Sequence, residues 1–138
     1  DGWIERLEQL LQEIPLAGVG ECGLDKAILK DVDYPTQERI VAEHWHLAAK
    51  YHRPLTLHCV SGSWGRLLSL LTKLTKEPSP SSSSSQSGSQ LLPALPSAVI
   101  LHSCNTLPID MIKSLGKLGN VYFSIAGRNI HEKTLKLI

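Results

Sequence analysis

Three side chains that can bind metal ions each follow a short apolar run of the sequence. Glu21 follows AGVG, His58 follows PLTL and His102 follows AVIL. Imidazole and carboxylate groups are suitable ligands for divalent cations. Any one of these residues alone is more simply interpreted as a core histidine or a solvated glutamate. Three of them at equivalent positions favour a metal site.

Cys59 and Arg66 suggest a second chemistry, that of a cysteine phosphatase. Such an enzyme needs a Cys-x₅-Arg loop, so that the arginine closes a cradle around the phosphate and lowers the pKa of the thiol. Here six residues separate Cys59 from Arg66, and Gly65 stands where the arginine belongs. We therefore interpret Cys59 as a small buried residue rather than a nucleophile.

Alternating helices and strands would have to position these residues. Apolar residues at helical spacing predict helices at the start of the chain and over about 35–52, 63–76 and 108–115. Short apolar runs predict strands near 17–22, 54–60, 97–103 and 120–126. Strict alternation indicates βαβ units and a parallel sheet. Because the carboxyl ends of parallel strands open on one side, Glu21, His58 and His102 should converge there.

The expected fold class is α/β, and the architecture is a partial (β/α)₈ TIM barrel. The strands are almost continuously apolar, as in sheets that are covered on both faces. A doubly wound sheet is the competing architecture. Residues 1–138 are expected to form part of one barrel domain, cut from a larger protein, with a disordered serine-rich insertion over 78–90.

Composition narrows the possible partners and the compartment. The formal net charge is only +1, so no general basic field draws the chain to nucleic acid. No apolar run approaches the length of about twenty residues that a membrane span needs. The cysteines at 22, 59 and 104 show no CxxC spacing, which is typical of a reducing compartment. We expect a cytoplasmic protein, with the nucleus as the alternative.

Several segments together resemble the TatD-type deoxyribonucleases, which are metal-dependent hydrolases built on a TIM barrel. GECGLD is similar to the family's GEIGLD signature, and Gln37 with ERIVAEHWHLA and RPLTLH follows its Q…F…Q…LA…PV.IH pattern. VILHSC and VYFSIAG resemble the later VLHCFSG and YISISG segments. The resemblance covers about residues 17–127, and it would make this chain approximately strands 3 to 6 of the barrel.

The resemblance implies roles for individual residues. Glu21 would be the catalytic carboxylate shared between two divalent metal ions, His58 and His102 would hold the second ion, and Asp25 would support the site. Mg²⁺ is the first expectation for the metal, with Mn²⁺ or Zn²⁺ as alternatives. The implied reaction is hydrolysis of phosphodiester bonds in DNA, as in a 3′–5′ exonuclease that acts on single-stranded ends.

Some family ligands have no counterpart in this chain. The family's HxH pair on the first strand and its late aspartate are missing, and His44-x-His46 falls in a predicted helix, where side chains at i and i+2 point about 200° apart. We therefore expect this chain alone to be inactive. The alternative function is a non-catalytic barrel that acts as a binding module. Trp64 is interpreted as a packing residue rather than a base-stacking one, and Arg66 as either a phosphate contact or a solvated charge.

Overall fold

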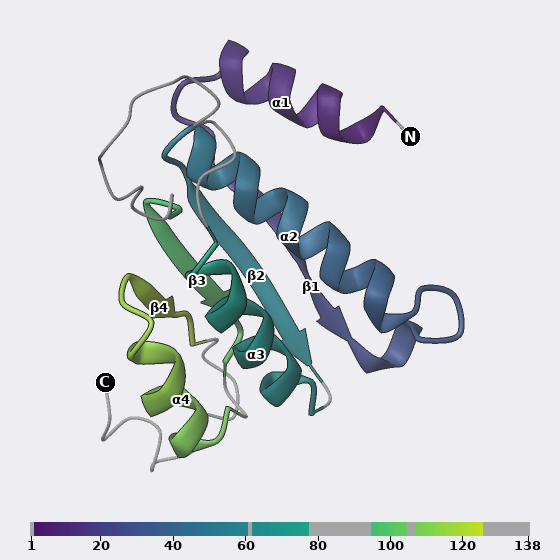
Figure 1. Cartoon of the computed structure of the whole chain (residues 1–138), viewed down its shortest axis with the longest axis vertical. Helices are drawn as coiled ribbons and strands as arrows, with labels where there is room; N and C mark the ends of the chain where they lie inside the picture. The colour runs from purple at the N-terminus through teal and green to yellow at the C-terminus, as the bar shows by residue number, and fades with distance from the viewer. Residues whose placement is uncertain (1, 61, 78–94, 105–106, 126–138) are drawn as a thin grey trace.

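Helices and strands alternate along the chain in the computed structural model, which describes residues 2–60, 62–77, 95–104 and 107–125 (Figure 1). The elements are α1 (Trp3–Glu13), β1 (Val19–Asp25), the 3₁₀ turn η1 (Lys26–Ile28), α2 (Tyr34–Lys50), β2 (Pro54–Val60), α3 (Trp64–Leu74), β3 (Ala98–His102), α4 (Ile109–Gly116) and β4 (Val121–Phe123). The predicted serine-rich insertion over 78–90 lies outside the described residues.

The four strands form one sheet in the order β1-β2-β3-β4, and every neighbouring pair is parallel. The predicted parallel sheet is therefore confirmed, and β2 has the predicted bounds. β1 begins and ends later than the strand predicted near 17–22, because it runs from Val19 to Asp25. Gly23 to Asp25 stay in register with His58 to Val60 of β2.

Helices α2, α3 and α4 lie on one face of the sheet (Figure 1). The core between the two layers is made of alternate strand residues and the inner faces of the helices; its members include Leu24, Leu55, Leu57, Leu101, Val41, Trp45, Leu67, Leu71 and Leu115. No described element covers the other face. One helical layer over consecutive parallel strands is the arrangement of a barrel segment, whereas a doubly wound sheet has helices on both faces.

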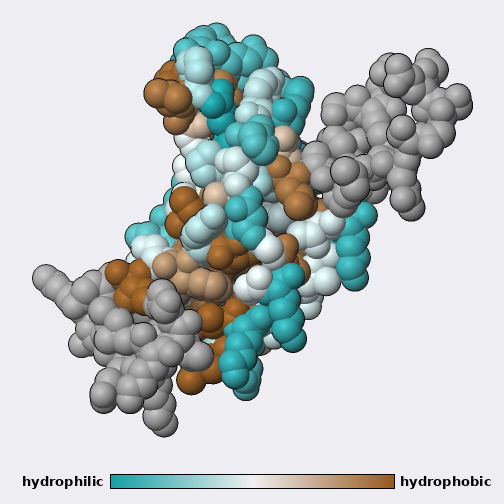
Figure 2. Space-filling model, turned by 90° about the vertical axis from the view of Figure 1, so that its left-hand side faces the viewer, coloured by the Kyte–Doolittle hydropathy of each residue, from teal (hydrophilic) through white to brown (hydrophobic). Residues whose placement is uncertain are grey.

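The described strands do not close into a barrel, since β1 and β4 are the two edges of the sheet. Figure 2 views the molecule from the β4 side and shows hydrophobic residues gathered over its lower part, below a mainly hydrophilic upper part. Tyr122 of β4 is 58% exposed. Among the described helices, none is long and apolar enough to cross a membrane.

Helix α1 packs on the amino-terminal side of the sheet through contacts with α2. Glu8 accepts hydrogen bonds from Lys50 and from the Tyr51 hydroxyl, at 2.5 and 2.7 Å. The Trp3 ring stacks on His44, with 5.1 Å between ring centroids. His46 Nε2 instead lies 3.4 Å from a carboxylate oxygen of Glu77, three residues after the end of α3. His44 and His46 therefore serve different packing contacts and do not form a metal-binding pair.

Candidate metal centre

Glu21, His58 and His102 meet at the carboxyl-terminal side of the sheet, and we call them the histidine–glutamate cluster. His58 Nδ1 lies 3.0 Å from Glu21 Oε1. His102 Nδ1 lies 3.3 Å from Glu21 Oε2. Each carboxylate oxygen thus faces one imidazole. The three side chains are 41%, 34% and 50% exposed, in the same order, so a small ion can reach them from solvent.

The two histidines lie side by side because β2 and β3 pair in register. His58 is the partner of His102, and Leu57 is the partner of Leu101. Leu57, Cys59 and Leu101 are buried under the helices. Since side chains alternate across a strand, His58 and His102 point to the open face. Alternation and register together place both imidazoles in one row.

Glu21 reaches the same face through an irregularity in β1. Val19 pairs with Leu55 and Cys22 with Leu57, so β1 has one more residue than β2 between these pairs. This is the arrangement of a β-bulge, which re-aims the side chain beside it. Val19 and Cys22 are both buried on the helix side, which leaves Glu21 on the open face. In a regular strand, residues three apart such as Val19 and Cys22 would point to opposite faces. The extra residue lets both of them be buried on the helix side.

A glycine makes the bulge sterically possible. Gly20 has φ +118°, and a Cβ atom there would collide with the carbonyl oxygen of Thr56 on β2. Both the backbone angle and the close approach exclude ordinary side chains at this position. The GVGE segment therefore contributes a backbone conformation as well as the carboxylate.

Asp25, predicted to support the site, lies at the end of β1 and does not join the histidine–glutamate cluster by any hydrogen bond or ion pair among the described residues. Its carboxylate accepts a hydrogen bond from Ala27 N–H at 2.7 Å and so caps η1. Its backbone N–H donates to Gln37 Oε1 at 2.7 Å, and its carbonyl accepts from Gln37 Nε2 at 3.0 Å. Asp25 thus shapes the loop after β1.

Gln37 makes buried hydrogen bonds that its place in the family's sequence pattern did not predict. Gln37 is 3% exposed, and among the described residues only Ser63 is another buried polar side chain. The sequence does contain a signal for this burial, because Gln37 lies on the same helical face as the apolar residues Val41 and Ala48. A buried amide in that position needs hydrogen-bond partners.

The donor set of the histidine–glutamate cluster fits a divalent cation by its chemistry. Two imidazoles and one carboxylate suit Zn²⁺, Mn²⁺ or Mg²⁺ to different degrees. In the described residues, however, no three His, Cys, Asp or Glu side chains surround a common point at which an ion would sit. The three groups face one another instead, so an ion would have to replace the contacts between the imidazoles and the carboxylate.

The cysteines lie in the core rather than at the site. Cys59 is 3% exposed, and burial raises the pKa of its thiol to about 12. Burial also raises the pKa of Cys22 to about 12. A thiol of this kind is protonated and weakly nucleophilic at neutral pH. These observations contradict a phosphatase function for Cys59 and confirm that it is a packing residue.

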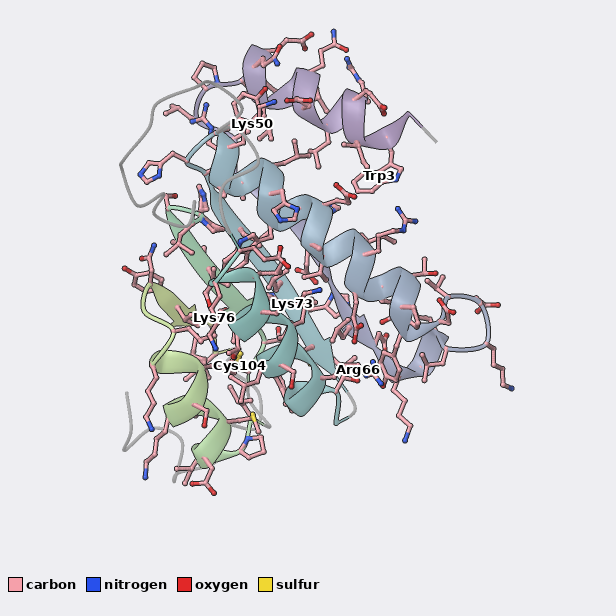
Figure 3. All side chains as sticks on the ribbon, viewed as in Figure 1. Trp3, Lys50, Arg66, Lys73, Lys76 and Cys104 are labelled. Carbon is pink, nitrogen blue, oxygen red and sulfur yellow. The ribbon has the colours of Figure 1, made fainter. Side chains whose placement is uncertain are left out.

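Trp64 and Arg66 also have structural contacts. Trp64 is 6% exposed, which confirms the packing interpretation. Arg66 Nη1 donates to Glu38 at 2.7 Å, and its guanidinium lies 4.4 Å from the centre of the Tyr34 ring. Figure 3 shows Arg66 near the carboxyl end of β2, with Lys50 at the opposite end of the sheet. An open groove that Arg66, Glu38 and Lys73 help to line lies between α2 and α3, in the helix layer.

The fold and the site together define an α/β protein of the parallel-barrel type, with polar side chains gathered at the carboxyl-terminal side of its sheet. The sequence model of one family, TatD related DNase, matches residues 1–138, and the chain belongs to this family. It is therefore a TatD-like hydrolase or nuclease at the level of the family. A comparison with curated protein sequences found no match.

Proposed function

We propose that this protein is a metal-dependent deoxyribonuclease that hydrolyses phosphodiester bonds in DNA. The observation that carries the proposal is the Glu21 carboxylate, which faces His58 with one oxygen and His102 with the other. Family membership supports a nuclease activity of this kind. The 3′ end of a single strand is the substrate that we propose, following the resemblance to the TatD-type deoxyribonucleases.

The residues of the histidine–glutamate cluster would hold divalent metal, with Mg²⁺ as the first choice and Mn²⁺ or Zn²⁺ as alternatives. Bound divalent ions supply an activated water and neutralise charge on the attacking and leaving oxygens of the phosphodiester. Glu21 provides the negative charge that attracts a cation, and each of its oxygens lies near an imidazole nitrogen. The backbone pairing of His58 with His102 keeps the two imidazoles next to each other.

Three ligands are few for two metal ions, and the remaining coordination has to come from groups beyond these three side chains. We therefore propose that residues 1–138 alone bind metal weakly and hydrolyse DNA slowly or not at all. A protein that includes the family's first-strand HxH pair and late aspartate would have the complete ligand set.

A nuclease assay tests the proposal, on a protein that joins residues 1–138 to the family's first-strand HxH pair and late aspartate. Labelled single-stranded DNA is incubated with Mg²⁺ or Mn²⁺ and with wild type, His58→Ala or His102→Ala. His46→Ala is the matched control, because His46 contacts Glu77 in the helix layer. We expect both cluster variants to lose hydrolysis and metal affinity together, while the control keeps both. Undiminished cleavage in both cluster variants would rule out this site. DNA binding without cleavage in every protein would favour a non-catalytic binding module.

A further inference from the structure

Gln37 connects α2 to the end of β1 through two of its three side-chain hydrogen bonds, and the third goes to Val32 in the loop before α2. Its Oε1 accepts from Asp25 N–H at 2.7 Å, and its Nε2 donates to the carbonyls of Asp25 and Val32, at 3.0 and 2.8 Å. An amide side chain can make four hydrogen bonds, and three are used here. At 3% exposure, the amide has little access to water as a substitute partner. The contact is therefore specific and difficult to replace.

The amide of Gln37 makes two hydrogen bonds with the backbone of Asp25, as a neighbouring strand does elsewhere in a sheet. It accepts from the backbone N–H and donates to the backbone carbonyl of the same residue. β1 is an edge strand among the described elements, with β2 as its partner on one side. Asp25 is also paired with Val60 of β2. Gln37 thus fixes the last residue of β1 on the side away from β2.

The fixed end of β1 lies close in sequence to the bulge that presents Glu21. The regular pairing with β2 resumes at Cys22 and runs to Asp25, and it includes the pair Gly23 and His58. Glu21 immediately precedes this four-residue stretch. A change in the position of the stretch would move the Glu21 carboxylate relative to both imidazoles.

We propose that Gln37 is a positioning residue for the histidine–glutamate cluster. By holding both backbone groups of Asp25, it keeps β1 in the register that brings Glu21 to His58 and His102. The proposal extends the proposed function to a residue that touches neither metal nor DNA, and it rests on that function where metal affinity is concerned. The position of the two imidazoles tests it independently.

The test compares the variants Gln37→Met and Leu74→Ala with wild type, in the same protein that joins residues 1–138 to the family's remaining ligands. Methionine has nearly the length of glutamine but makes none of the three hydrogen bonds. Leu74 is buried at the far end of α3, so Leu74→Ala controls for a general loss of stability. Two properties are measured: the ring resonances of His58 and His102 by NMR without metal, and the affinity for Mn²⁺ alone by calorimetry.

We expect Gln37→Met to shift the ring resonances of both histidines and to weaken Mn²⁺ binding by about tenfold or more, as seen for residues that orient metal ligands. Leu74→Ala should lower the melting temperature and change neither property. Unshifted resonances in Gln37→Met, or equal shifts in Leu74→Ala, would overturn the proposal. If wild type binds no Mn²⁺ while the resonances shift only in Gln37→Met, the positioning role stands and the proposed function fails. Should Gln37→Met not fold, Gln37→Asn, which keeps the amide but is one methylene shorter, takes its place with the same readouts.

Discussion

Gly23 lies opposite His58 in the parallel register of β1 and β2, and the two backbones approach too closely for a side chain on Gly23. A Cβ atom added to Gly23 would collide with the carbonyl oxygen of His58. It would also lie 2.8 Å from the carbonyl carbon of His58 and 2.9 Å from its backbone nitrogen. The second glycine of GECGLD is therefore required by the strand that carries one of the site histidines.

Gly23→Ala should destabilise the protein by roughly 1–3 kcal/mol, because backbone atoms must move to admit the methyl group. Urea denaturation followed by circular dichroism measures the change. Gly65→Ala is the matched control, since a Cβ atom at Gly65 meets no atom within 4 Å. Gly65 lies in α3, where alanine is preferred, so the control should gain about 0.5–1 kcal/mol. Equal stability of Gly23→Ala and wild type would show that β1 can move away from β2.

Cys59→Ser should keep the metal-dependent hydrolysis that we propose, because Cys59 lies under the helices while His58 points to the open face. With a thiol pKa of about 12, Cys59 should also resist alkylation by iodoacetamide at pH 8 in the folded protein and react only after unfolding in urea. Mass spectrometry of the alkylated peptide measures this. Rapid alkylation of native Cys59, together with loss of turnover in Cys59→Ser, would restore the thiol as a nucleophile.

Glu8→Gln should weaken the attachment of α1 to α2 in a pH-dependent way. The hydrogen bond from Lys50, and to a smaller extent the one from Tyr51, hold the pKa of Glu8 below its ordinary value of 4.5. A lowered carboxyl pKa contributes stability above the ordinary value and loses it as pH falls through the lowered value. The ion pair is solvent-accessible, so we expect a difference of about 0.2–1 kcal/mol at pH 7.

The measurement is the free energy of unfolding of wild type and Glu8→Gln between pH 7 and pH 3. The two curves should converge at the acid end, and high salt should reduce their separation at pH 7. Glu13→Gln is the control, because Glu13 accepts its hydrogen bond from Gln9 within α1 itself. A difference that persists unchanged at pH 3 would mean that packing of the side chain, rather than its charge, joins α1 to α2.

Arg66→Met should cost about 0.5–1 kcal/mol more stability than Glu38→Gln, because it removes the contact with the Tyr34 ring as well as the ion pair. Urea denaturation of both variants and of the double variant gives the coupling between Arg66 and Glu38. We expect DNA affinity to change little in Arg66→Met, since the guanidinium is already engaged by a carboxylate. A large loss of DNA affinity with unchanged stability would instead identify Arg66 as a phosphate contact.

The sequence by itself determined the class of fold and the convergence of the three candidate ligands. Apolar runs and helical spacing report which residues are buried, and burial follows the local period of 2 or 3.6 residues. Strict alternation then implies parallel strands, and parallel strands bring His58 and His102 together wherever the helices between them lie. Spacing excluded Cys59 as a phosphatase nucleophile, because six residues separate it from Arg66 and a Cys-x₅-Arg loop has five.

Only the tertiary structure decided how Glu21 joins the histidines and what holds it there. The bulge at Gly20 and Glu21 depends on the register between β1 and β2, which no local pattern contains. The three hydrogen bonds of Gln37 and the ion pair of Arg66 join residues that are distant in sequence or lie across a loop. Polar side chains choose partners by position in space, and a one-residue change in register would give each of them different neighbours.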